Sequence, residues 1–290
     1  MNHSLEIKEL KKSFQDFKAV DGINFYVEGN VYYESGSGKA ICTETPAITR
    51  NFLQFLDDDL NSKNNAEEIE MNSIVKPATY SSGTIGYEDG RLIHLDGDTW
   101  LLSTCREHNS KNINQMALLH VEEDRVDRVL LLHGHEDDLY QKNWMPFIHR
   151  GELLLIYACE PLTVLRPNLD TGHCDVISST VTPVFCGLLR GGSQGVWFND
   201  HYLFLVHEVA EHADGRHYYH RFLALDETLA FVSLSPAFYL QHLGIEFVAG
   251  LCVDEDRDEL VIAWGYNDAE ARFSQVPLTA VLRFLSIDKL

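Results

Sequence analysis

One unit recurs along the chain: two apolar segments rich in Val, Ile, Leu, Tyr and Phe, joined by a short polar turn. The copies occupy residues 23–33, 91–104, 147–158, 196–207 and 251–265. Turns such as Asp-Gly-Asp and Asn-Asp between segments of this kind are typical of β-hairpins. Each copy is therefore predicted to be a hairpin, and successive copies start 68, 56, 49 and 55 residues apart.

The spacing of these hairpins constrains the fold. A period of roughly 40–50 residues is typical of β-propeller blades. Further apolar segments, which supply additional strands, begin at Gln115, Thr163, Tyr218 and Val281. Helices do not alternate with strands, which disfavours a doubly wound α/β fold, and a two-sheet sandwich is the structural alternative. We predict an all-β, five-bladed β-propeller that forms one domain over residues 1–290, with a short N-terminal helical segment at residues 4–17.

Composition limits the partners that the chain can have. It contains 44 acidic and 23 basic residues, a net charge of −21, whereas nucleic-acid binding needs a basic surface. No apolar run approaches the length of about 18 residues that a membrane span requires, and the polar N-terminus lacks the apolar core of a signal peptide. We therefore expect a cytoplasmic protein with neither nucleic acid nor membrane as partner. Its oligomeric state stays open at this point.

A segment near the N-terminus partly resembles a phosphate-binding loop, G-x-x-x-x-G-K-[ST]. Gly38-Lys39 is present, but Tyr33 occupies the first glycine position and Ala40 the position of the Ser or Thr. We expect no ATP binding at residues 36–39. The cysteines show no CxxC spacing and the histidines no H-E-x-x-H motif, so neither a metal site nor a bound cofactor is expected.

Polar residues occur at the same position in hairpins two to five. One set precedes the first strand (residues 87–91, 141–146, 190–195 and 244–250), and the other follows the second (residues 105–108, 159–161, 208–211 and 266–270). These two points are neighbours in an antiparallel hairpin, and the first strand of a propeller blade lines the axis. We therefore predict that both sets converge on one axial pocket. The alternative is that they only cap the blades.

The residue types in these blocks are those of sites that process sugars. A carboxylic acid can protonate a leaving glycosidic oxygen, aromatic faces pack on sugar C–H groups, and Asn, Arg and carboxylates hydrogen-bond hydroxyls. The acidic residues available are Glu88, Asp89, Glu107, Glu208, Glu246 and Asp268.

At these residues the sequence resembles the β-mannoside phosphorylase family, glycoside hydrolase family 130, and its five-bladed relatives. The likeness spans residues 41–290 and rests on short motifs at residues 86–93, 142–147, 190–194, 245–251 and 265–268. The first is similar to the family's Glu-Asp-Pro-Arg block, with Gly90 in place of the proline.

The resemblance implies an inverting phosphorylase or hydrolase that acts on a mannose-like glycoside, with a small carbohydrate as substrate and inorganic phosphate as co-substrate. It implies that Asp89 donates the proton, while Glu246 and Asp268 hold sugar hydroxyls and are the next catalytic candidates. The resemblance further implies that Lys142, Arg190 and His207 bind the phosphate. The remaining sugar contacts would come from Glu88, Arg91, Asn143, Trp144, Glu208 and Asn267.

The alternative function is a non-catalytic glycan-binding or scaffold propeller that works with a glycosyltransferase partner. Asp89 separates the two hypotheses. An enzyme requires this carboxyl group to face a pocket that also holds a Lys, Arg and His cluster. An axis plugged by side chains would instead favour the binding module.

Overall fold

The computed structural model describes residues 23–25, 31–33, 40–42, 46–57, 60–61, 63, 65–71, 74, 76–213 and 215–287. The predicted N-terminal helix at residues 4–17 and the loop at residues 36–39 lie outside these residues. The described chain is all-β apart from one short helix, α1 (Leu278–Phe284). No described helix has the length and apolar character needed to cross a membrane.

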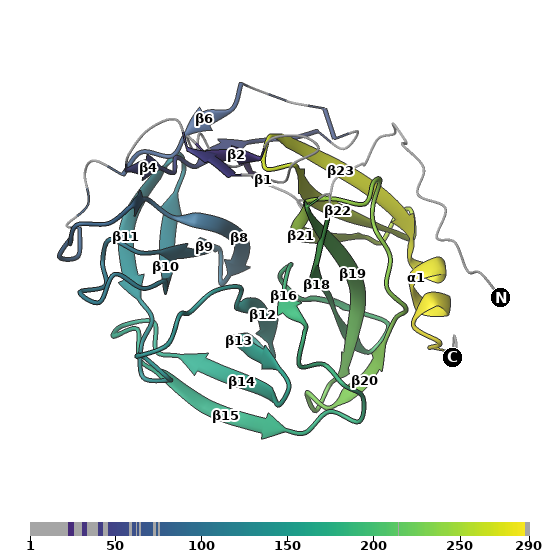
Figure 1. Ribbon diagram of the computed structural model, residues 1–290. Helices are drawn as coiled ribbons and strands as arrows, with labels where there is room; N and C mark the ends of the chain where they lie inside the picture. The colour runs from purple at the N-terminus through teal and green to yellow at the C-terminus, as the bar shows by residue number, and fades with distance from the viewer. Residues whose placement is uncertain are drawn as a thin grey trace.

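Four antiparallel sheets are arranged around a common axis as in a β-propeller (Figure 1). The first contains β8 (Glu88–Leu95), β9 (Asp98–Cys105), β10 (Gln115–Glu122) and β11 (Arg125–Leu131). The second contains β12 (Met145–His149), β13 (Glu152–Cys159), β14 (Leu162–Pro167) and β15 (Cys174–Thr180). The third contains β16 (Arg190–Gly191), β17 (Val196–Phe198), β18 (His201–His212), β19 (Gly215–Asp226) and β20 (Phe231–Leu234). The fourth contains β21 (Glu246–Asp254), β22 (Glu259–Tyr266) and β23 (Glu270–Pro277).

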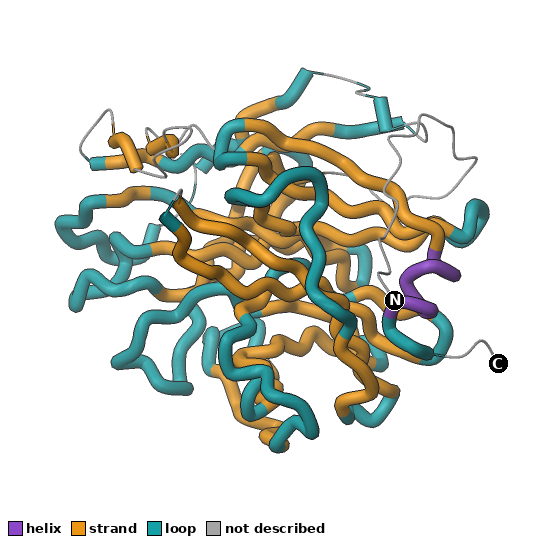
Figure 2. The backbone as a smooth tube through the Cα atoms, turned by 45° about the vertical axis from the view of Figure 1, so that its right-hand side comes forward, coloured by secondary structure: helices purple, strands orange, loops and turns teal. Residues whose placement is uncertain are grey.

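The predicted hairpins two to five are confirmed as β8–β9, β12–β13, β17–β18 and β21–β22. Three of the predicted additional strands are also present, as β10, β14 and β19. In each sheet the early strands β8, β12, β16 and β21 lie near the axis, and the last strands lie at the rim (Figure 1). Strands make up most of the described backbone (Figure 2).

Seven short strands precede the first sheet and lie between it and the fourth sheet in the ring (Figure 1). They are β1 (Ile23–Phe25), β2 (Val31–Tyr33), β3 (Ala40–Cys42), β4 (Ala47–Ile48), β5 (Phe52–Gln54), β6 (Glu67–Glu68) and β7 (Thr84–Ile85). The predicted hairpin over residues 23–33 is wrong, because β1 pairs with β5 and β2 pairs with β3. Strands this short form few ladder bonds, so tertiary contacts decide their pairing.

The strand predicted from Val281 is also wrong, because this segment forms α1. Leu278, Val281, Leu282 and Leu285 are all buried, and their spacing of three and four residues places them on one face of a helix. That face packs into the apolar core beside the fourth sheet. The third strand of the sheet is instead β23, which pairs with β22.

Close backbone contacts, one toward the second sheet and one within the third, explain the Gly-Gly pair at residues 191–192. A Cβ atom added to Gly191 would lie 1.9 Å from the carbonyl oxygen of Asn143, and one added to Gly192 would lie 2.3 Å from that of Leu205. Both distances are far below van der Waals contact. Only glycine lets the inner strands approach this closely, so the motif has a packing role at the axis.

Candidate functional site

A β-bulge at the start of β8 positions Asp89. Glu88 pairs with Thr104 and Arg91 with Leu102, so β8 carries one more residue than β9 between these two pairs. Asp89 lies inside the bulge with φ of 54°, a left-handed conformation that costs energy for any residue except glycine. Bulges beside functional sites often redirect one side chain. Here the redirected carboxylate meets a residue of the second sheet.

That residue is Lys142, which immediately precedes the second sheet. Its Nζ atom lies 3.0 Å from Asp89 Oδ2 and 3.7 Å from Glu88 Oε2. Burial raises the pKa of Asp89, but the positive charges of Lys142 and Arg91 outweigh it, and the pKa is lowered overall. Burial is also the main reason that the pKa of Glu88 is raised. Asp89 is therefore ionised at neutral pH.

Asp268 brings the fourth sheet to the same place. Asn267 and Asp268 form the turn between β22 and β23, with φ of 54° and 51°. The pKa of Asp268 is raised to about 6, mainly by burial and secondly by the negative charge of Asp89. The positive charge of Lys142 opposes this shift. Charge interactions thus link polar blocks of the first, second and fourth sheets, while a shared axial pocket stays a prediction. We call Glu88, Asp89, Lys142, Arg190, His207 and Asp268 the axial cluster.

Arg91 lies at the axis and is completely buried. Its Nε donates a hydrogen bond of 2.5 Å to the carbonyl of Gly192, and Nη1 donates one of 2.6 Å to the carbonyl of Asp89. Nη2 lies 3.5 Å from Asn143 Oδ1, and the guanidinium lies 5.4 Å from the centre of the Phe247 ring. Burial lowers its pKa to about 10, so it stays cationic at neutral pH. A sugar contact stays a prediction for Arg91; in the structure its side chain joins the first and fourth sheets to the loops before β12 and after β16.

Arg190 and His207 face each other across β16 and β18. His207 is 2% exposed, and its Nδ1 has no hydrogen-bond partner among the described residues. Its ring stacks on Tyr218 with a centroid distance of 5.2 Å. Burial lowers the pKa of His207 well below its usual value, and the charges of His220, Arg91 and Arg190 act in the same direction. The ring is therefore neutral, and its buried Nδ1 makes no hydrogen bond within the described part of the chain.

Three other predicted site residues have contacts that account for them structurally. Glu246 is fully buried, and its carboxylate accepts backbone N–H bonds of 2.6–2.9 Å from residues 240–242. Trp144 is 2% exposed and packs in the core between the first and second sheets. Glu208 accepts a 3.2 Å hydrogen bond from Arg221 on the neighbouring strand. None of these contacts points to a sugar.

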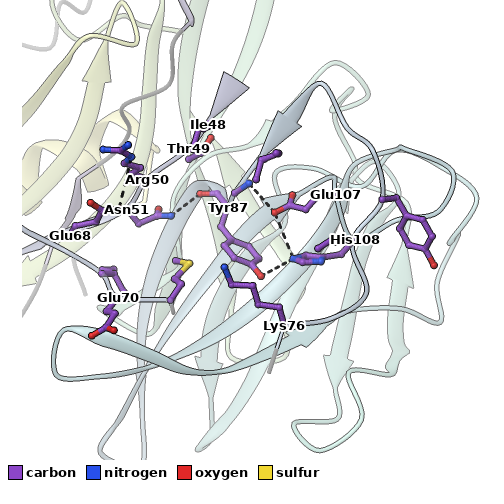
Figure 3. Close-up of a pocket in the computed structure, with 16 residues that line it drawn as sticks. Ile48, Thr49, Arg50, Asn51, Glu68, Glu70, Lys76, Tyr87, Glu107 and His108 are labelled. Carbon is purple, nitrogen blue, oxygen red and sulfur yellow. Dashed lines mark hydrogen bonds and ion pairs between the residues drawn. The ribbon is translucent and has the colours of Figure 1, made fainter. Parts of the chain in front are cut away.

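A further pocket of about 590 Å³ lies beside the N-terminal strands and the first sheet (Figure 3). Its wall includes Tyr87, whose hydroxyl lies 2.9 Å from His108 Nε2, and Glu107, which accepts a 2.9 Å hydrogen bond from the backbone of Gly86. Gly86 has φ of 104°, and a Cβ there would lie 2.3 Å from the carbonyl of Thr49. The sequence pattern groups Glu107 with the axial acids but does not distinguish Tyr87 or His108, although both belong to the polar blocks.

No sequence profile of a known protein family matches the chain, and no curated protein matches it by sequence. Solved structures do match it. The chain is similar to β-1,2-mannobiose phosphorylase from Listeria innocua, with 11% identity and a TM-score of 0.58 over 96% of this chain and 86% of that one. It is similar to a proposed glycoside hydrolase from Bacteroides ovatus, with 11% identity and a TM-score of 0.55 over 97% and 98% of the two chains. Another from Parabacteroides distasonis has 12% identity and a TM-score of 0.55 over 90% and 94%. At these identities the likeness establishes a shared propeller fold.

Proposed function

We propose that the protein is a carbohydrate-active enzyme that cleaves a glycosidic bond at the axial cluster. The observation that carries the proposal is a pair of acids with opposite pKa shifts: Asp89 is held ionised, while the pKa of Asp268 is raised to about 6. Enzymes that cleave glycosides need one carboxyl group that keeps a proton and a second group that stays charged. The propeller fold shared with a mannobiose phosphorylase supports the same reaction class.

In the free protein Asp268 is the better proton donor of the two, which differs from the role that the family resemblance implies for Asp89. The donor must hold its proton near the working pH, and Lys142 at 3.0 Å opposes this for Asp89. We therefore assign proton donation to Asp268. Asp89 is assigned to the opposite face of the sugar, where its ionised carboxylate activates water in hydrolysis or, in phosphorolysis, positions the Lys142 ammonium that binds the phosphate.

For the nucleophile, we propose inorganic phosphate held by Lys142, Arg190 and His207. The ammonium and guanidinium groups supply charge-assisted hydrogen bonds. The neutral imidazole supplies a single N–H, and a bound anion would satisfy its buried nitrogen. In an inverting phosphorolysis, phosphate oxygen attacks the anomeric carbon while the glycosidic oxygen leaves with the proton of Asp268. The substrate that the resemblance favours is a mannose-like glycoside.

We also propose that the N-terminal strands complete a fifth blade. They fill the part of the ring between the first and fourth sheets (Figure 1), and β1 pairs with β5, which pairs with β6. A crystal structure with a separate radial sheet at this position would be the expected result, and a four-bladed ring would contradict it.

The test is turnover of a panel of mannosides with and without phosphate, followed as sugar 1-phosphate and as reducing sugar. Asp268→Asn should lower kcat by about 10²–10⁴-fold, the usual contribution of a general acid. Arg190→Ala should mainly raise the KM for phosphate. The control is Asp98→Asn, the same change at the exposed first residue of β9. Full activity of Asp268→Asn together with loss in Asp89→Asn would reverse the two roles.

Two observations favour a second function, a glycan-binding module that works with a glycosyltransferase. The lowered pKa of Asp89 keeps the family's proton-donor position ionised, and Arg91 beside it is fully buried, with its guanidinium bonded to backbone carbonyls. Binding of a mannoside measured by calorimetry, with no turnover at any phosphate concentration, is the outcome that selects this function.

A further inference from the structure

The outer edge of the second sheet carries a run of uncharged residues in this acidic chain. No charged residue occurs between Asp175 and Arg190. Six of the sixteen exposed large apolar side chains in the described part of the protein fall in this stretch. They are Val176, Ile177, Val181, Val184, Phe185 and Leu188. Scattered apolar residues are normal on a surface, but such clustering indicates an interaction site. We call residues 176–188 the rim strip.

The fold holds the rim strip in a defined shape. Within the described chain, β15 is the last strand of its sheet and pairs with β14 as its only strand partner. The backbone N–H of its first residue, Cys174, donates a 2.7 Å bond to the carbonyl of His133. Beyond this bond, the other edge of β15 lies at the rim (Figure 1). The loop that follows is anchored by Cys186, which is 1% exposed and whose backbone N–H donates a 3.4 Å bond to Glu160. On either side of this anchor, Phe185 is 75% exposed and Leu188 is 66% exposed. An open strand edge beside fixed apolar side chains can accept another strand.

We propose that the rim strip is the interface of a homodimer, in which β15 of one protomer pairs antiparallel with β15 of its partner. Two copies that each carry a net charge of −21 repel over most of their surface. That repulsion is weakest where both present uncharged residues. A two-fold axis brings the same patch from both copies together, so each apolar strip covers the other. Pairing centred on Ser178 also places the two Asp175 carboxylates at opposite ends of the interface.

The size of the strip sets the expected affinity. It contains fewer residues than the roughly 20–30 per side of a standard interface, so we expect dissociation constants in the micromolar range. Salt should strengthen the dimer, because screening weakens the repulsion between acidic copies and leaves apolar burial intact. An interface held by ion pairs would respond to salt in the opposite way.

Sedimentation equilibrium of the full chain over a range of protein and NaCl concentrations tests the proposal. We expect a species of twice the 33.0 kDa chain mass whose fraction rises with salt. Phe185→Glu should weaken dimerisation by at least tenfold, because it buries a charge from each copy. The control is Val232→Glu, the same charge change at a 37% exposed site on the outer strand β20 of the third sheet. A monomer at every concentration and salt, or equal effects of both variants, would overturn the proposal.

Disulfide formation tests the strand pairing directly. In an antiparallel pair centred on Ser178, the two Cα atoms of this residue lie about 4.5–5.5 Å apart, within the range that a disulfide can bridge. Ser178→Cys should therefore give a covalent dimer under mild oxidation, beyond the level of the wild type with its native cysteines. Val232→Cys should not. Equal cross-linking of the two variants would refute β15 pairing.

Discussion

Replacing Arg91 by Met is the sharpest test of how the axis is built. The change keeps an apolar stem but removes the hydrogen bonds of 2.5 and 2.6 Å to the carbonyls of Gly192 and Asp89. Hydrogen bonds from a charged donor contribute roughly 1.5–3 kcal/mol each, so their loss costs about 3–6 kcal/mol. Removing a buried charge offsets part of this loss. We expect a net decrease of about 3 kcal/mol in the free energy of unfolding.

The expected change in Tm follows from the size of the chain. Unfolding entropy near Tm is about 2.1 cal/mol/K per residue, which gives about 0.6 kcal/mol/K for 290 residues. A loss of about 3 kcal/mol therefore lowers Tm by about 5 °C in a calorimetric scan. The Tm of Arg91→Lys should lie between those of Arg91→Met and the wild type. An ammonium group keeps the charge but lacks the planar guanidinium geometry that donates to two carbonyls at once.

Arg125→Met provides the matched control. This arginine is half exposed and paired with Glu122, and an exposed ion pair contributes little to stability. Its Tm should shift by no more than about 2 °C. Equal Tm values for the Arg91 and Arg125 variants would refute the idea that Arg91 ties the sheets together.

Three further predictions concern buried ionisable groups. The pKa of Asp268 is raised from 3.8 to about 6. Between these two pH values the folded chain keeps a proton that the unfolded chain releases, so stability falls as pH rises. Asp268→Asn should remove this fall from a plot of Tm against pH. Burial lowers the pKa of His220 from 6.5 to about 3, so stability is instead lost as pH falls below about 6.5. His220→Phe should make Tm less dependent on pH below that value. Glu246→Gln replaces one acceptor of backbone N–H groups by a donor, which should cost about 1–3 kcal/mol in denaturant unfolding; an unchanged midpoint would show that residues 240–242 do not need the carboxylate.

The sequence predicted the four long hairpins because their turns and apolar segments are local signals. It also predicted that Asp89, Lys142 and Asp268 approach one another, since strand ends have fixed positions in a propeller. It could not predict the protonation order of the two acids, which depends on the 3.0 Å contact with Lys142. The position of the Arg91 side chain likewise depends on its hydrogen bond to the carbonyl of Gly192, which lies far away in the sequence. The helix at Val281 was predictable in principle from the spacing of its buried residues.

The order of sheets in the ring has a consequence for the two acids. Asp89 belongs to the first sheet and Asp268 to the fourth, and the N-terminal strands lie between these sheets (Figure 1). The two sheets also meet directly, because the Arg91 guanidinium of the first lies 5.4 Å from the Phe247 ring of the fourth. We therefore expect the separation of the two carboxyl groups to depend on this inner contact as well as on the N-terminal strands. A substitution at Phe247 should then change the distance between the two acids while leaving every polar residue of the site unchanged.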